Sequence, residues 1–313
     1  MEAADALSPP RVTVGRRVAD LFYGRHRLTV GSLLAGPLGW LVVGYLGSLA
    51  VLFAAAFWNV NSLTGEVAQT FTTDNFKTIF TESVYRTVAL RTVGIAAAVT
   101  VTDALLAFPV AFYMAKVARR RGKAVLVVAV LMPLWSSYLV KVYSWRVILS
   151  SGGVLDWALH PLGIQGPGYG NLAVWLVMSY LWLPYMILPI FAGLERIPDS
   201  LLAASEDLGG GPFTTFRRVI LPLALPAVVA GSIFTFSLTL GDYITPQLVS
   251  NNDFIGTVVY SNITNNLPLA SAFATVPVLI MIVYLLIARK LGAFEHLCCS
   301  AGARGSLCGR PSG

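Results

Sequence analysis

The sequence predicts an all-α membrane protein with six transmembrane helices. Three observations support this fold class: the composition of the chain, the lengths of its apolar segments and the positions of its cations. Of its 313 residues, 56% are hydrophobic and 12% are charged, whereas average protein composition includes about 25% charged residues. The mean hydropathy of +0.71 agrees with this comparison, so lipid is the expected solvent for most of the chain.

Six apolar segments are long enough to cross a membrane. A bilayer core about 30 Å thick requires about 20 residues of helix, and the runs that approach this length are residues 33–58, 92–115, 124–147, 172–194, 223–249 and 272–288. Several runs contain proline, which membrane bundles tolerate because neighbouring groups satisfy the freed backbone carbonyls. We therefore expect one transmembrane domain over residues 32–292, flanked by tails at 1–31 and 293–313.

The lysines and arginines fall mainly on one side of the predicted helices. Seventeen of the 22 lie in the two tails and in the second and fourth connections. The other five, Lys77, Arg86, Arg91, Lys141 and Arg146, belong to the opposite side. Because connections rich in Lys and Arg stay in the cytoplasm, both termini are expected to be cytoplasmic.

The remaining composition excludes several classes of function. The net charge of +7 does not indicate a nucleic-acid partner, because the cations lie beside apolar segments and not along one polar face. Cys298, Cys299 and Cys308 form no CxxC pair and have no clustered histidines, so we expect neither a disulfide framework nor a metal site. A reduced cytosolic tail is the first interpretation, and palmitoylation of Cys298 and Cys299 is the alternative.

Residues 195–222, between the fourth and fifth predicted helices, form the most informative connection. After Pro198 the pattern predicts a short amphipathic helix that ends at Gly209, and Pro212 is suited to the first turn of a second helix. Small side chains on the first helix would let the groove of another protein approach closely. The alternative is an element that lies on the lipid headgroups and is anchored there by arginines.

The run Ala203-Ala204-Ser205-Glu206-Asp207-Leu208-Gly209, followed after nine residues by Val219-Ile220-Leu221-Pro222, resembles the EAA loop of ABC importer permeases. Ala203 stands where the family has Glu, and Ser205 where it has the second Ala. The resemblance implies contacts to a cytoplasmic ATPase from Ala203, Ala204, Ser205, Glu206, Gly209, Arg217 and Arg218. It also implies the type I importer architecture, in the inner membrane of a bacterial cell.

Other motifs are similar to those of the spermidine/putrescine-type permeases: Asp74-Asn75-Phe76, Phe108-Pro109-Val110-Ala111-Phe112, Met132-Pro133-Leu134-Trp135, Lys141-Val142-Tyr143-Ser144-Trp145 and Gly241-Asp242-Tyr243-Ile244-Thr245-Pro246. The family implies a second, similar permease, two ATPase subunits and an extracytoplasmic solute-binding protein. ATP and Mg would bind the ATPase subunits, because this chain lacks a GxxxxGK[ST] phosphate loop. No cofactor and no catalytic residue are expected here.

Two carboxylates inside predicted spans are candidates for the solute pathway, because a charge at mid-membrane costs at least about 2.5 kcal/mol. They are Asp103 and Asp242. A structural alternative exists for each: Asp103 accepting hydrogen bonds from Thr100, Thr102 or a neighbouring helix, and Asp242 ending a helix at the interface. Aromatic side chains that would suit an amine are Trp135, Tyr143, Trp145, Tyr180, Trp182 and Tyr185. An aromatic belt at the membrane surface explains the same residues without a substrate.

A polyamine is the leading substrate, followed by another amine, ferric iron, thiamine or a sugar. The main competing hypothesis is a secondary transporter or channel, against which the EAA-like loop argues. A membrane-embedded enzyme is disfavoured because His26, His160 and His296 are scattered and no catalytic grouping occurs inside the spans.

Overall fold

The computed structural model describes residues 34–61, 66–163 and 165–290. It divides into two compact units, Met1–Ala55 and Ala56–Gly313. Among the described residues of the first unit, an apolar helix runs over Leu34–Ala55 and includes the π-helical segment η1 (Leu41–Leu46) and α3 (Gly47–Ala55). This helix corresponds to the first predicted span. The basic N-terminal tail and the C-terminal cysteines lie outside the described residues.

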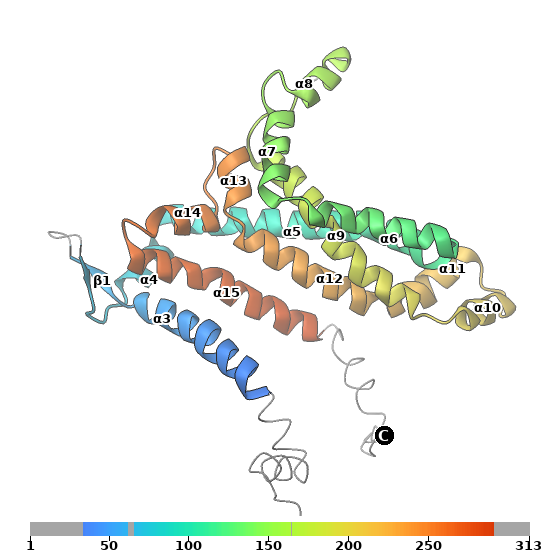
Figure 1. Cartoon of the computed structure of the whole chain (residues 1–313), viewed down its shortest axis with the longest axis horizontal. Coiled ribbons are helices and arrows are strands. Elements are labelled where there is room, and N and C mark those ends of the chain that lie inside the picture. The colour runs from blue at the N-terminus through green and yellow to red at the C-terminus, as the bar shows by residue number, and fades with distance from the viewer. Residues whose placement is uncertain (1–33, 62–65, 164, 291–313) are drawn as a thin grey trace, which may run out of the picture. The chain divides into compact units, whose positions relative to one another are not determined.

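In the part of the second unit that the structure describes, four further helices are long and apolar enough to cross a membrane: Ser83–Val117, Asn171–Glu195, Pro212–Gly241 and Leu267–Arg289. They contain α5 (Ser83–Phe112) with the π turn η2 (Tyr113–Val117), α9 (Asn171–Glu195), α11 (Pro212–Thr215) with the π turn η4 (Phe216–Ile220) and α12 (Leu221–Gly241), and α15 (Leu267–Lys290). Figure 1 shows α5, α9, α12 and α15 running along the same direction.

The third predicted span is not one straight helix. It is a pair, α6 (Arg120–Trp135) and α7 (Tyr138–Leu149), bent by 88°. Ser136 and Ser137 are extended at the bend, and the Pro133 carbonyl, which the break leaves without a helical partner, accepts the Ser136 hydroxyl at 2.9 Å and the Lys141 ammonium at 3.0 Å. Counted as one span, this pair completes the predicted six.

The fifth predicted span begins and ends earlier than expected. The short second helix expected after the glycines is the first turn of this span, because the helix is continuous from Pro212 to Gly241. Asp242 then has an extended backbone, and residues expected within the span form the separate α13 (Ile244–Val249). The break leaves the side chain of Asp242 beside the end of one helix and the start of another.

The core of the second unit lies between α5, α9 and α12, which pack against one another. Small residues bring α9 and α12 together: a Cβ on Gly193 would overlap Ala227, and one on Gly231 would lie 2.7 Å from the Met186 sulfur. Close backbone approach of this kind is a main source of packing between membrane helices, because lipid supplies no hydrophobic driving force between them.

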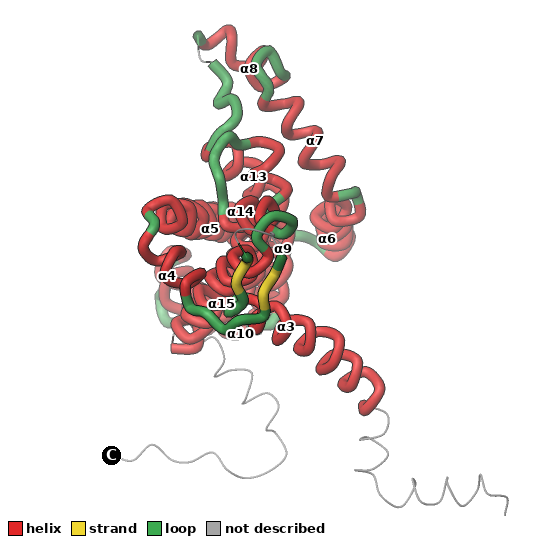
Figure 2. Tube along the Cα trace, turned by 90° about the vertical axis from the view of Figure 1, so that its left-hand side faces the viewer, coloured by secondary structure: helices red, strands yellow, loops and turns green. Residues whose placement is uncertain are grey.

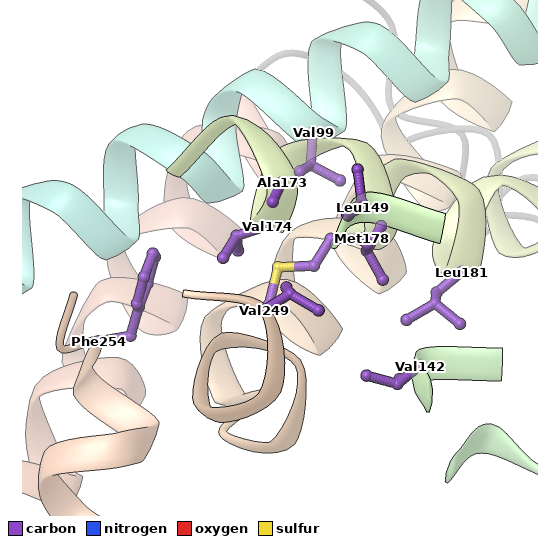
Figure 3. Packing of buried hydrophobic residues seen from close by; sticks show 10 residues of the cluster. Val99, Val142, Leu149, Ala173, Val174, Met178, Leu181, Val249 and Phe254 are labelled. Atoms are coloured by element: carbon purple, nitrogen blue, oxygen red, sulfur yellow. The ribbon is translucent and has the colours of Figure 1, made fainter. Parts of the chain in front are cut away.

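A second apolar cluster joins these helices to the shorter elements near α13. Figure 3 shows Val99 of α5 and Met178 of α9 near Val249 of α13 and Phe254, all of them buried.

The strands β1 (Asn59–Val60) and β2 (Val67–Ala68) pair antiparallel. The remaining described elements are α4 (Asp74–Thr81), α8 (Val154–Leu159), the 3₁₀ turn η3 (His160–Leu162), α10 (Asp199–Asp207) and α14 (Ile255–Asn262).

These shorter elements lie at opposite ends of the long helices. Figure 1 places α10 at one end of α9 and α12, and α4, α13 and α14 toward the other. Figure 2 shows α7 and α8 extending away from the long helices beyond the bend after α6. The second unit therefore has a helix–turn element at one end and a broken-helix region, containing α7, α13 and Asp242, toward the other.

Candidate functional site

The connection between α9 and α12 has the geometry that the glycines predict. The helix α10 follows Pro198, and its cap residue Leu208 leads to Gly209 with φ +75°. A residue with a Cβ adopts this left-handed conformation only with strain. Gly210 is required for space, because a Cβ there would lie 2.6 Å from the Ser205 carbonyl oxygen. The two glycines thus end α10 and fix the turn into α11.

One face of α10 is open, whereas Leu202 on the other face packs against the core of the bundle. Ala203, Ala204 and Glu206 are exposed, Leu208 is 88% exposed, and the neighbouring Phe213 is 74% exposed. Arg217 and Arg218 are exposed in η4. Ser205 differs from the others in the predicted set, because its hydroxyl lies 2.8 Å from that of Thr215 and joins α10 to α11. Small exposed side chains beside two cations form a surface that a partner protein can approach closely.

Toward the other end of the helices, the Asp242 carboxylate lies at the break between α12 and α13. One carboxylate oxygen, Oδ1, accepts the backbone N–H groups of Ile244 at 3.0 Å and Thr245 at 3.3 Å, so Asp242 caps the start of α13. The other oxygen, Oδ2, accepts the hydroxyls of Tyr138 and Thr245, both at 2.6 Å. The structural role proposed as an alternative for Asp242 is therefore present. Within the described part of the chain, Asp242 forms no salt bridge with a lysine or arginine.

A shallow open pocket of about 410 Å³ adjoins this carboxylate. It is lined by Tyr138, Trp182, Ser237, Leu238, Gly241, Asp242 and Tyr243. The rings of Tyr138 and Trp182 stack with centroids 6.1 Å apart, and Tyr185 contacts Trp182 edge-on at 5.8 Å. Aromatic faces beside a carboxylate offer two attractions to an organic cation, Coulombic and cation–π.

The other predicted pathway residues do not line this pocket. Trp135 is 87% exposed, Tyr143 is exposed, and Trp145 pairs with Tyr180 at 5.4 Å. These positions fit a membrane-facing belt as well as they fit a pathway.

Asp103 is fully buried in α5, and neither carboxylate oxygen has a hydrogen-bond partner among the described residues. The two threonines expected as possible donors to Asp103 form other hydrogen bonds. The Thr100 hydroxyl donates to the Ala96 carbonyl, and the Thr102 hydroxyl accepts a hydrogen bond from the Trp175 indole N–H.

Five residues of the pocket were not predicted as pathway residues: Tyr138, Ser237, Leu238, Gly241 and Tyr243. Tyr138 carries a signal that was available in the sequence, because it follows two consecutive serines in the middle of an apolar run. Such a pair can interrupt a helix by bonding its own backbone. Ser237 carries no comparable signal and is identified only when α12 is placed beside α7 and α9.

Comparisons with known proteins agree with this architecture. The family model for the inner membrane component of binding-protein-dependent transport systems matches residues 98–293. The inner membrane ABC transporter permease protein YdcU of Escherichia coli K12 is 44% identical, covering 93% of this chain and 98% of YdcU. The spermidine/putrescine permease PotB of Haemophilus influenzae is 28% identical, covering 79% of this chain and 87% of PotB.

A solved structure shares the fold at lower sequence identity. It is a bacterial alginate ABC transporter in complex with a pentasaccharide-bound periplasmic protein, and the matching chain has a TM-score of 0.70 at 15% identity, covering 88% of this chain and 96% of that one. The chain described here therefore belongs to the family of binding-protein-dependent inner membrane permeases and is a multi-pass permease subunit of a bacterial ABC importer.

Proposed function

We propose that the solute carried by this permease is a polyamine such as spermidine or putrescine. The single observation that carries the proposal is the pocket in which Asp242 lies beside Trp182 and Tyr243. Its carboxylate has no cationic partner among the described residues. A charge near the end of a membrane helix attracts a counter-charge, and a solute with ammonium groups supplies one.

The remaining walls of the pocket suit the rest of such a molecule. Polyamines alternate ammonium groups with methylene segments, and aromatic faces bind both: a cation over a ring contributes about 0.5–1 kcal/mol when exposed and about 2 kcal/mol when desolvated. The likeness to PotB, a permease of a spermidine/putrescine transport system, supports the same substrate class.

The internal hydrogen bonds of Asp242 indicate weak, exchangeable binding. Its Oδ2 already accepts two hydroxyls, so an ammonium group must displace the Tyr138 hydroxyl or share the oxygen with it. A pathway requires affinity high enough for entry and low enough for release. Because the hydroxyl donors of Asp242 stay close to its carboxylate and can replace the ammonium group, the solute can be released.

Partners would bind at the two ends of the long helices of the second unit. Two ATPase subunits dock on the exposed surface of α10 and its counterpart in a second permease, and hydrolyse ATP with Mg. An extracytoplasmic binding protein delivers the solute near α7 and α13, and both termini of this chain are cytoplasmic.

The test is uptake by proteoliposomes that contain the complete importer. Radiolabelled spermidine and putrescine should accumulate with ATP, and neither maltose nor thiamine should compete. Asp242→Asn keeps an acceptor oxygen for the α13 cap but removes the charge. Losing a hydrogen bond to a charged group costs about 1.5–3 kcal/mol, so uptake at low substrate concentration should fall about tenfold or more.

The matched control is Asp253→Asn, at an exposed aspartate in the loop before α14, which should transport at the wild-type rate. Uptake of maltose or thiamine in place of the polyamines, or a wild-type rate for Asp242→Asn, would contradict the proposed substrate class while leaving the importer assignment intact.

A further inference from the structure

Lys116 joins three helices at the end of the molecule where α10 lies. It belongs to η2, the π turn that ends the α5 helix, and its side chain is only 10% exposed. Its ammonium group donates to the Ile197 carbonyl at 2.6 Å and to Asp199 Oδ1 at 2.8 Å. Ile197 follows the end of α9, and Asp199 is the first residue of α10. One largely buried cation therefore links the α5 helix, the end of α9 and the start of α10.

The opposite end of α10 is attached to a different helix. The Ser205 hydroxyl lies 2.8 Å from that of Thr215, which is buried in α11, and the Gly210 N–H donates to the Ser205 carbonyl at 2.8 Å. Because α11 continues through η4 into α12, α10 is attached to α5 at its first turn and to α12 at its last. A displacement of α10 is therefore delivered to two core helices.

Both attachment points adjoin a π turn. The turn η2 contains Lys116, the turn η4 directly follows Thr215, and Phe108 of α5 contacts Phe216 of η4 edge-on at 5.6 Å. Turns of this kind are uncommon insertions that often mark functional positions in helices.

Burial distinguishes Lys116 from the other ion pairs in the described residues. Lys123 and Glu195, 2.9 Å apart, are 28% and 50% exposed, and Lys77 and Asp74, 3.0 Å apart, are 70% and 69% exposed. Exposed pairs are screened by water and contribute little. The Lys116 side chain is largely shielded from water, although that of Asp199 is not. Removing the ammonium group would leave the Ile197 carbonyl, just after α9, without this donor.

We propose that Lys116 is a positioning residue for transport: it makes α5 and the end of α9 move with α10 when the ATPase subunits move. The inference rests on the proposed docking of the ATPase at α10. From Lys116, α5 leads to the core it shares with α9 and α12, and α12 ends at the Asp242 pocket. The link thus runs from the docking surface to the pocket by way of packed helices.

The experiment compares three variants in the complete reconstituted importer. Lys116→Met removes the ammonium but keeps the apolar stem, Lys116→Arg keeps a cation with several donors, and Lys77→Met removes the exposed cation of a similar pair on α4. Two quantities are measured: co-purification of the ATPase subunits, and stimulation of ATP hydrolysis by binding protein loaded with spermidine.

For Lys116→Met we expect full co-purification with at least about fivefold lower stimulation, the lower end of typical coupling between linked sites. Lys116→Arg should recover at least half of the stimulation, and Lys77→Met should match wild type. Asp199→Ala, at a side chain that is 88% exposed and removable without disturbing packing, should also lower stimulation and guards against a folding defect in Lys116→Met.

Normal stimulation in both Lys116→Met and Asp199→Ala would overturn the proposal. Loss of ATPase co-purification in Lys116→Met would overturn it too, because Lys116 would then act in docking. Failure of the wild-type chain itself to bind the ATPase would instead refute the proposed docking at α10.

Discussion

The Tyr138 hydroxyl lies 2.6 Å from Oδ2 of Asp242, although the two residues are 104 positions apart in the chain. Tyr138 is the first residue of α7 after the bend, and Asp242 is the residue at which α12 ends. One hydrogen bond therefore joins the two places where predicted straight helices are broken. The pocket exists because both breaks lie side by side.

Removing this hydrogen bond should lower the stability of the pocket region. Tyr138→Phe keeps the ring stacked on Trp182 but leaves Asp242 with one donor fewer. Hydrogen bonds to charged groups contribute about 1.5–3 kcal/mol, so the thermal midpoint of the purified protein should fall measurably. Tyr143→Phe, at an exposed tyrosine five residues further along α7, is the control and should not change the midpoint. An unchanged midpoint for Tyr138→Phe would show that the bond does not hold the breaks together.

Close packing of α9 on α12 leads to a second prediction. In Gly231→Ala the new methyl group would lie 2.7 Å from the Met186 sulfur and 3.2 Å from its carbonyl oxygen. Overpacking typically costs about 1–3 kcal/mol, so this variant should show a lower thermal midpoint and a lower yield of folded protein. Gly94→Ala in α5 meets no atom within 4 Å and should resemble wild type. Equal stability of the two variants would mean that α9 and α12 are not in this contact.

The orientation in the membrane gives a third prediction. A reporter that is active only outside the cytoplasm should give no signal when fused near Gly122, in the cation-rich first turn of α6, and a strong signal near Gly153, between α7 and α8. The opposite pattern would reverse the orientation and place α10 outside the cell.

The ion pair at α10 should persist over the physiological pH range. The hydrogen bond and charge of Lys116 lower the pKa of Asp199 below its ordinary value of 3.8. A lowered pKa means that the carboxylate's contribution is complete above about pH 4 and is lost only as the pH falls through the lower, folded-state pKa. The effect of Asp199→Asn on ATPase stimulation should therefore be the same at about pH 8 and about pH 5. A variant that differs from wild type at about pH 8 but matches it at about pH 5 would contradict the assignment.

The sequence predicts the elements whose signal is local. Apolar length identifies the spans, and the glycines at 209–211 predict the end of α10, because left-handed backbone and close approach require glycine at Gly209 and Gly210. The bend at Ser136–Ser137 was missed because 124–147 is apolar on both sides of it, so span length alone describes one helix.

The pocket could be predicted only in part, because it depends on contacts between distant segments. Asp242 is conspicuous as a charge near the end of an apolar run, and Tyr138 follows two serines that can interrupt a helix, whereas Ser237 resembles an ordinary polar residue of a span until α7 and α12 are brought together. Lys116 was recognised as a cytoplasmic cation, but its burial depends on the return of the chain to Ile197 and Asp199, 81 and 83 residues later.

The exposed surface of α10 and its glycine turn can be altered without disturbing the spans. Gly209→Asp forces a Cβ-bearing residue into φ +75°, at a cost of about 1 kcal/mol or more, and places a charged side chain in open space at the end of α10. Ala203→Glu is the counterpart, because it restores the family residue on the exposed face and should be tolerated.

The most direct measurement is ATP hydrolysis by the reconstituted importer, titrated with spermidine-loaded binding protein and followed by recovery of the ATPase subunits with this chain. We predict strong stimulation for wild type and Ala203→Glu, and its loss in Gly209→Asp while the spans still insert. Full stimulation together with full recovery of the ATPase in Gly209→Asp would show that α10 and its glycine turn do not couple this permease to ATP hydrolysis.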